Sequence, residues 1–313
     1  MTGSPRLFVE LAPRHHRGLP LSNPVMIASG TAGYCVEFGE ITDIQKLGAV
    51  VCKGTTLRPR EGNPQPRLVE TAGGVLNAVG LENIGVDALI RDKAPVWAGW
   101  QVPVIVNVAG ETVEEYAAVA GRLEGVPGVS GIEVNISCPN VSAGSMEFGV
   151  DPELAARVTS AVKSATSLPV IVKLSPNVTD IKEIALAVEE AGADAICLIN
   201  TLRGMAIDVA ARKPSLGNVM GGLSGPAIKP VALRMVFETA EVSGVPVIGC
   251  GGILSAGDAL EFIMAGATAV QVGTAGLTSP ASYLSILEGI EHFMMDNGFE
   301  DITEVVGMAR RIA

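Results

Sequence analysis

The sequence has little of several features that mark particular classes of protein. Aromatic residues make up only 4% of the 313 residues, so extended aromatic stacking surfaces are not expected. No uncharged apolar stretch is long enough for a membrane-spanning helix, and residues 1–23 have no apolar run typical of a signal peptide. Basic residues number 22 against 33 acidic ones, and the net charge of −11 disfavours binding to nucleic acid or an anionic membrane. We therefore expect a cytoplasmic protein.

Cysteine and histidine are also scarce, and their spacing matches neither a metal site nor a disulfide framework. No CxxC pair occurs and the cysteine count is odd, which is typical of free thiols in a reducing compartment. The cysteines are Cys35, Cys52, Cys138, Cys197 and Cys250. The three histidines are His15, His16 and His292. None of the histidines lies near an expected strand end, so proton abstraction would fall to Cys, Ser or Lys.

Short apolar runs alternate with amphipathic segments along the chain. Apolar residues make up 48% of it, enough for a large core. Eight runs predict strands of a parallel sheet covered on both faces. They are Pro24–Ala28, Ala49–Lys53, Val102–Val108, Gly131–Ser137, Pro169–Ser175, Asp194–Thr201, Val245–Gly249 and Ala269–Gly273. Helices are predicted at Phe38–Leu47, Val86–Ala94, Val113–Leu123, Asp151–Ala165, Asp180–Ala191, Pro226–Val242, Ala256–Ala265 and Pro280–Met295.

This alternation predicts an α/β protein, a (β/α)8 TIM barrel that forms a single domain over residues 1–313. A doubly wound open sheet stays as the alternative. Leu7–Leu21, with a turn at Arg17 and Gly18, predicts a hairpin that closes the barrel bottom. Residues 55–83 and 202–224 exceed a minimal barrel, and both follow strand ends where such barrels build active-site loops. A Gly- and Ser-rich loop at 138–150 is a candidate lid.

Polar residues end six of the eight predicted strands. They are Ser29, Lys53, Asn107, Asn135, Lys173 and Asn200. A strand-end Asn or Ser is commonly a turn former, but lysine is rarely buried without an anionic partner, so this rim predicts a binding site. The last two strands end in Gly-rich turns at 249–252 and 273–274, where backbone N–H groups can approach a phosphate. An ordinary tight turn is the alternative for each of them.

One thiol follows a strand end at this rim. Cys138 lies in the run NISCPN at 135–140, so we expect it to be the reactive cysteine. Cys52 and Cys197 lie within apolar strands and are expected to pack as small hydrophobic residues. Cys35 and Cys250 are expected to be structural as well.

These motifs together resemble the class 1 dihydroorotate dehydrogenases, and their B type in particular. NISCPN is similar to the catalytic-cysteine segment of that family, and NAVGLEN at 77–83 is similar to its orotate-binding segment. Residues 57–71, 200–208 and 221–234 are similar to B-type segments. Two departures, Val79 in place of Ile and Cys35 in place of Gly, remove no functional group. The class 2 enzymes use serine in place of the cysteine and carry a membrane helix, unlike this sequence.

The resemblance implies an FMN enzyme of de novo pyrimidine (UMP) biosynthesis that oxidises (S)-dihydroorotate to orotate. Cys138 would take a proton from C5 while a hydride passes from C6 to FMN, and Lys173 would stabilise negative charge on the flavin. FMN would contact Ser29, Lys53, Gly54, Asn107, Asn135, Lys173, Ile199, Gly225, Gly251, Gly252, Gly273 and Thr274. The substrate would contact Lys53, Asn77, Ala78, Val79, Gly80, Leu81, Asn135, Asn140, Asn200 and Thr201.

The resemblance also implies a partner. B-type enzymes pass electrons to NAD through a subunit with FAD and an iron–sulfur cluster, and this sequence has no CxxxxCxxC run or dinucleotide-binding fingerprint of its own. A homodimer is expected, or a heterotetramer with that subunit, docked through an exposed apolar patch. No metal is expected on this chain. Three alternatives stay open: a fumarate-reducing A-type enzyme, a dihydropyrimidine dehydrogenase-like FMN reductase, and a non-catalytic phosphate-binding barrel.

Overall fold

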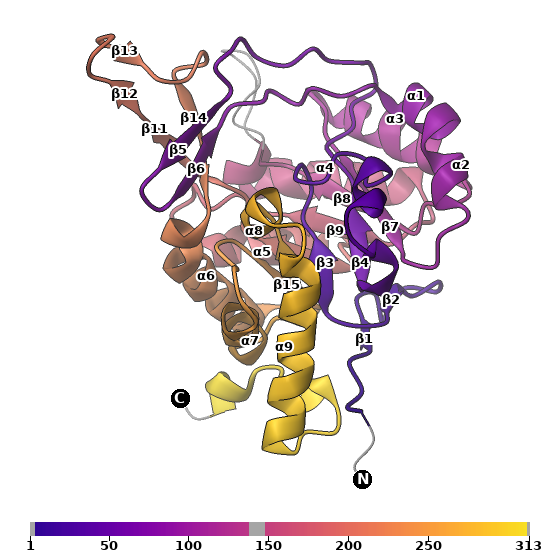
Figure 1. Cartoon of the computed structure of the whole chain (residues 1–313). Coiled ribbons are helices and arrows are strands. Elements are labelled where there is room, and N and C mark those ends of the chain that lie inside the picture. Colours follow the sequence, from indigo (N-terminus) through magenta and orange to yellow (C-terminus); the bar gives the residue numbers. More distant parts are fainter. Residues whose placement is uncertain (1–3, 138–147, 312–313) are drawn as a thin grey trace.

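Eight parallel strands close into a barrel at the centre of the computed structural model, which describes residues 4–137 and 148–311 (Figure 1). Around the barrel the strand order is β10-β15-β16-β3-β4-β7-β8-β9. The strands are β3 Val25–Ile27, β4 Ala49–Val51, β7 Val104–Val108, β8 Gly131–Asn135, β9 Val170–Lys173, β10 Ala195–Leu198, β15 Val247–Cys250 and β16 Ala269–Val272. All eight predicted strands are present. The (β/α)8 barrel is therefore confirmed and the open sheet is excluded.

Helices surround the barrel and cover its outer face. They are α1 Val86–Asp92, α2 Ala94–Trp97, α3 Val113–Leu123, α4 Pro152–Ala165, α5 Ile181–Glu190, α6 Lys229–Val242, α7 Ala256–Ala265, α8 Thr274–Thr278 and α9 Ser282–Asn297. Several begin at side-chain caps that satisfy free backbone N–H groups. Thr112 accepts a hydrogen bond from the Glu115 N–H, Asp151 accepts one from Leu154, and Ser255 forms a capping box with Asp258.

The predicted helix at Phe38–Leu47 is wrong. Two separate 3-10 turns, η1 Glu37–Glu40 and η2 Ile44–Lys46, occupy that segment. Gly39 and the β-branched Ile41 and Thr42 have low helix propensity, and Asp43 has ψ 81°, outside the helical region. A smaller difference is that the helix predicted from Pro226 is a 3-10 turn, η4 Pro226–Ile228, followed by α6.

The two segments in excess of a minimal barrel pair with each other. Residues 55–83 supply β5 Leu68–Thr71 and β6 Gly74–Asn77, and residues 202–224 supply β11 Leu202–Met205 and β14 Met220–Ser224. These form an antiparallel sheet in the order β11-β14-β6-β5, with a small ribbon of β12 Ile207–Asp208 and β13 Lys213–Pro214 beyond it. The insertion sheet lies at the end of the molecule opposite the two chain termini (Figure 1).

The N-terminal hairpin is confirmed. β1 Val9–Glu10 pairs antiparallel with β2 Pro20–Leu21, and Gly18 takes a left-handed φ of 61° at the turn. Leu19 is buried, and its side chain faces the position of Gly131 at the start of β8, which places the hairpin at the N-terminal end of the barrel. Three further 3-10 turns are η3 Phe148–Val150, η5 Ile302–Glu304 and η6 Met308–Arg311.

Candidate active site

A cavity of about 380 Å³ opens between the C-terminal ends of the barrel strands and the insertion sheet. It brings together most of the residues predicted from sequence. Those that line it are Ser29, Lys53, Gly54, Asn77, Val79, Gly80, Leu81, Asn107, Asn135, Lys173, Ile199, Asn200, Thr201, Gly225, Gly251, Gly252, Gly273 and Thr274. Cys138 and Asn140 lie outside the described residues. Ala78 is fully buried against Leu76 and Leu216 and does not line the cavity.

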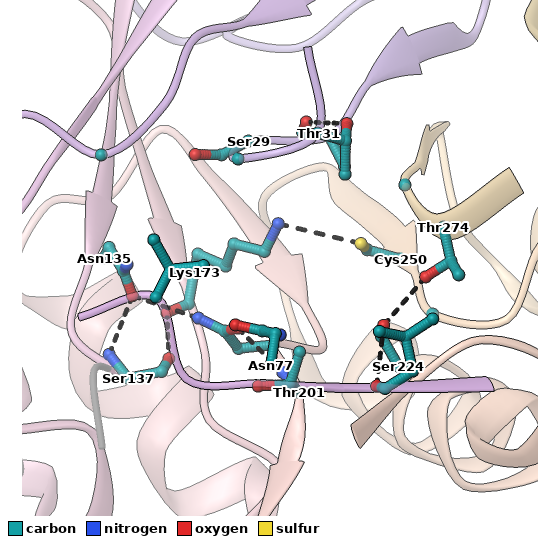
Figure 2. A pocket seen from close by; sticks show the side chains of 18 of the residues that line it. Ser29, Thr31, Asn77, Asn135, Ser137, Lys173, Thr201, Ser224, Cys250 and Thr274 are labelled. Atoms are coloured by element: carbon teal, nitrogen blue, oxygen red, sulfur yellow. Dashed lines mark hydrogen bonds between the residues drawn. The ribbon is translucent and has the colours of Figure 1, made fainter. Parts of the chain in front are cut away.

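The amides on one side of the cavity are fixed by hydrogen bonds to each other (Figure 2). The Asn135 side-chain oxygen accepts from the Ser137 N–H at 3.2 Å and from the Asn200 amide nitrogen at 3.1 Å. The Asn200 oxygen accepts from the Thr201 N–H at 2.8 Å. Because these amides are already oriented, they present donors and acceptors in fixed directions to a ligand.

Two further hydrogen bonds hold the insertion sheet over the cavity. Thr274, at the start of α8, donates to the Ser224 hydroxyl on β14 at 2.9 Å (Figure 2). Asn77 on β6 donates to the Gly222 carbonyl at 3.3 Å. These bonds tie the insertion sheet together and join it to the turn after β16. The sheet is thereby fixed above the barrel mouth.

Lys173 lies at the floor of the cavity with only 5% of its surface exposed. Its Nζ donates to the Gln271 side-chain oxygen at 2.8 Å, and it lies 3.8 Å from the Cys250 sulfur and 3.9 Å from a Glu133 carboxylate oxygen. Burial alone would lower the pKa of Lys173, but Cys250 and Glu133 raise that pKa above its ordinary value. The side chain is therefore a cation throughout the neutral range.

Three glycines shape the wall beside Thr274. Gly225, Gly251 and Gly252 have φ of 99°, 128° and 76°. A Cβ on Gly252 would lie 2.7 Å from the Lys229 Cβ and 2.8 Å from its backbone nitrogen. No larger residue fits there, so the backbone of this turn lies bare at the cavity, as a phosphate site requires.

The residues present fit a bound flavin nucleotide. The side-chain oxygen of Asn107 is buried and has no hydrogen-bond partner among the described residues, which is costly unless a ligand donates to it. Lys173 supplies a cation for the electron-rich edge of the ring, and the Gly-rich turns supply backbone groups for a phosphate. Ser29, Lys53, Asn107, Lys173, Gly225, Gly251, Gly252, Gly273 and Thr274 are the residues available to hold it.

Sequence reasoning missed two buried polar residues behind this floor. Glu133 and Gln271 contact Asn107 and Lys173, yet neither follows a strand end. Their only signal is a polar residue in the middle of an apolar strand. Cys250, expected to be structural, is buried and also lines the cavity. Its hydrogen bond with Cys197 and the nearby Lys173 lower the pKa of its thiol.

Residues 4–137 and 148–311 contain neither a metal-binding cluster nor a membrane-spanning helix. No group of three or more His, Cys, Asp or Glu side chains there is placed to hold a metal ion. Across the same two ranges, none of the helices combines the length and the apolar character needed to cross a bilayer. Cys35, Cys52, Cys197 and Cys250 are buried, free thiols.

A family model and several relatives of known name point to the same family. A sequence model described as dihydroorotate dehydrogenase matches residues 14–294. A protein from Geotalea uraniireducens (strain Rf4) is 55% identical over 305 residues, which covers 97% of this chain and 98% of that protein. One from Desulforamulus reducens is 58% identical over 291 residues, covering 93% and 96%, and one from Trichlorobacter lovleyi is 56% identical over 303 residues, covering 97% and 98%. Each relative is named dihydroorotate dehydrogenase B (NAD(+)), catalytic subunit. The chain belongs to the dihydroorotate dehydrogenase family.

Proposed function

We propose that the chain is the catalytic subunit of a B-type enzyme that oxidises (S)-dihydroorotate to orotate with FMN. The observation that carries this proposal is that Lys53, Lys173 and four asparagine side chains, from separate strands and the insertion sheet, line one cavity. The asparagines are Asn77, Asn107, Asn135 and Asn200. Amides match the alternating N–H and C=O groups of a pyrimidine ring, and a lysine matches its carboxylate.

Lys53 and Asn77 are proposed to hold the substrate together with Asn135, Asn140, Asn200, Thr201 and the backbone of 79–81. A wrong ligand that lacks the matching groups would leave these polar side chains unpaired, which is a source of specificity. When bound, the flavin supplies the hydride acceptor. Lys173 is proposed to stabilise the negative charge that accumulates beside it, because its ammonium is preorganised in a buried site.

A choice between substrates tests this function. Steady-state assays with dihydroorotate and dihydrouracil at equal concentration should show strong preference for dihydroorotate, because only that substrate carries the carboxylate for Lys53. Preference for dihydrouracil would support the dihydropyrimidine dehydrogenase-like alternative instead. A purified protein that takes up no flavin would favour the non-catalytic phosphate-binding barrel.

Cys138 is proposed to be the general base that removes the proton from C5. We expect Cys138→Ser to keep FMN but to lose about 10²–10⁴-fold in turnover at neutral pH, the usual contribution of a positioned base. A hydroxyl is a far weaker base than a thiolate, so activity should recover in part as pH rises. Rates of flavin reduction by dihydroorotate across pH 6–10 check this, and near-normal reduction at pH 7 would remove Cys138 from the mechanism.

Electrons are proposed to leave for NAD through a second subunit that carries FAD and an iron–sulfur cluster. The names of these relatives support this, since they combine NAD(+) with the term catalytic subunit. We also propose a cytoplasmic, single-domain chain that forms a homodimer. Rapid turnover of the isolated chain with fumarate would instead indicate the A type.

An exposed apolar surface supports docking with another chain. The insertion ribbon and its neighbours carry exposed Met205, Ile207, Val209, Val219 and Met220, with Val209 at 83% exposure. We call these five residues the ribbon patch, and large exposed apolar patches commonly mark protein–protein contacts. The molar mass of the chain in solution, with and without the substitution Ile207→Lys, tests whether the patch joins two copies. An unchanged dimer in the variant would exclude this surface.

A further inference from the structure

A buried polar cluster lies behind the floor of the cavity. It consists of Asn107 on β7, Glu133 on β8, Lys173 on β9 and Gln271 on β16, and we call it the barrel-floor cluster. Asn107 and Lys173 line the cavity, whereas Glu133 and Gln271 do not. Both of these inner residues have 0% exposure. A carboxylate in such a place is costly unless it is paired and hydrogen-bonded, so its contacts need an explanation.

Glu133 accepts hydrogen bonds from two side-chain amides. The Asn107 nitrogen donates to one carboxylate oxygen at 2.8 Å, and the Gln271 nitrogen donates to the other. Adjacent strand positions bring Asn107 and Glu133 together, because they are register partners in the β7–β8 pair. A carboxylate oxygen accepts and does not donate, so each amide must turn its nitrogen toward Glu133 and its oxygen away from it.

The two amide oxygens then have defined partners. The Gln271 oxygen accepts from Lys173 Nζ at 2.8 Å. The Asn107 oxygen has no partner among the described residues and lies beside Gly54, where a Cβ would be 3.1 Å from it. Gly54 also lines the cavity. One carboxylate therefore sets an acceptor at Asn107 and a cation at Lys173, both at the cavity floor.

We propose that Glu133 is a positioning residue for the flavin, acting through Asn107 directly and through Gln271 on Lys173. This inference rests on the proposed function, because it concerns how the same cavity holds its cofactor. The pyrimidine portion of a flavin carries an N–H donor between two carbonyl acceptors, and an acceptor and a cation fixed at its edge are complementary to it. Glu133 makes no contact with the cavity and is not a catalytic residue.

The substitution Glu133→Gln separates this role from simple space filling. Glutamine has almost the same shape but adds an NH2 donor, so the amides of Asn107 and Gln271 are no longer compelled to present their oxygens outward. Lys173 also loses its nearest carboxylate. We expect FMN to bind at least about tenfold more weakly, which corresponds to about 1.4 kcal/mol.

FMN titration of the flavin-free protein measures this, and four proteins form a double-mutant cycle. They are the native chain, E133Q, N107A and the E133Q/N107A double variant. If Glu133 acts through Asn107, the loss in the double variant is much smaller than the product of the single losses. E124Q is the matched control, because Glu124 is a surface carboxylate bonded to Ser167 and Thr166 and is not part of the cavity. Its FMN dissociation constant should stay within about twofold of the native value.

A pH profile adds a readout that a merely structural residue would not change. Within residues 4–137 and 148–311, the ionisable groups that face Lys173 are Glu133, Cys197 and Cys250. Removal of the Glu133 charge leaves the ammonium easier to deprotonate. The alkaline decline of FMN affinity should therefore move to lower pH in E133Q and stay in place in E124Q.

The outcomes separate this inference from the proposed function. A native chain that binds no FMN contradicts the proposed function, and this inference falls with it. If the native chain binds FMN, either of two results overturns only the role of Glu133. One is an FMN dissociation constant of E133Q within twofold of the native value. The other is additive losses in the double-mutant cycle together with an alkaline decline of FMN affinity that does not move. If E133Q does not fold, Gln271→Met takes its place, because it breaks the link to Lys173 and keeps the carboxylate. Tenfold weaker FMN binding in Q271M supports the inference, and unchanged binding overturns it.

Discussion

Single residues at the barrel rim were predictable because their positions within strands are visible in the sequence. Ser29, Asn107, Asn135 and Lys173 lie at or just after strand ends, and parallel strands deliver such residues to one face. Glu133 and Gln271 were not predictable in this way. They lie 138 residues apart, and they meet only because the strands close into a barrel and turn both side chains inward. Pairwise contact across a closed barrel leaves no local pattern in the sequence.

Replacement of Lys173 by methionine should destabilise the protein and weaken flavin binding. The substitution removes the ammonium and leaves Glu133 as a buried, unpaired charge, which typically costs about 3–5 kcal/mol. Chemical unfolding of the flavin-free protein and FMN titration measure the two effects. If the methionine variant equals the native chain in both flavin affinity and stability, the Lys173–Glu133 ion pair contributes to neither, which would contradict this account.

The pH dependence of the same group has a defined sign. The pKa of Lys173 is raised in the folded protein, so its stabilising contribution is fully present below the ordinary lysine pKa and is lost only as pH rises beyond that value. We therefore expect the stability difference between the native chain and K173M not to shrink between pH 6 and pH 9, and to grow toward pH 9, because Lys173 also lowers the pKa of the Cys250 thiol and K173M loses that stabilisation. A difference that shrinks across this interval would show that the amine deprotonates inside the fold.

At the scale of elements, the strand–helix alternation was predictable and the exceptions have local causes. The segment Phe38–Leu47 has apolar residues at helical spacing, but Gly39 and Asp43 interrupt the backbone and leave two 3-10 turns. The pairing of the two insertions into one sheet was not predictable, because β6 and β14 are joined by contacts between segments about 145 residues apart. The insertions follow the C-terminal ends of barrel strands, as expected, and they border the cavity there.

The Gly-rich turn after β15 should not tolerate a side chain. Gly252→Ala combines a φ of 76° with a close approach to Lys229, so we expect a loss of about 1–3 kcal/mol together with weaker FMN binding. Gly125→Ala is the matched control, because Gly125 has φ 69° with nothing within 4 Å of the added Cβ. It should lose about 1 kcal/mol and keep its flavin affinity. Equal flavin affinity in both variants would argue against a phosphate at this turn.

Glu124 ties the end of α3 to the turn before β9. Hydrogen bonds from Ser167 and Thr166 lower the pKa of its carboxyl to about 2. Because this pKa is lowered in the folded protein, the ionised carboxylate stabilises the fold above the ordinary value near 4.5. That stabilisation is lost as the pH falls from 4.5 toward 2. Because the carboxylate of Glu124 is exposed, it contributes less than about 1 kcal/mol to the free energy of unfolding. Thermal unfolding at pH 6 and pH 3 should show a smaller acid sensitivity in E124Q, and an equal one would contradict this role.

At the scale of the whole molecule, the sequence predicts the fold, the family and the collection of polar groups at one end of the barrel. It does not predict the surfaces that meet other chains. The ribbon patch lies on insertion strands and on the turns next to them, and sequence alternation alone does not reveal which of its apolar residues are exposed. The same holds for the surface that would meet the proposed partner subunit.

Anaerobic titration of the purified, flavin-loaded chain with dihydroorotate tests the central claim most directly. The visible flavin spectrum should bleach stoichiometrically as orotate forms, without NAD or a second subunit, because this chain's own cavity is proposed to hold both the hydride acceptor and the substrate. Dihydrouracil at the same concentration should leave the spectrum unchanged. A flavin-loaded chain whose spectrum does not respond to dihydroorotate would contradict the assignment of this cavity.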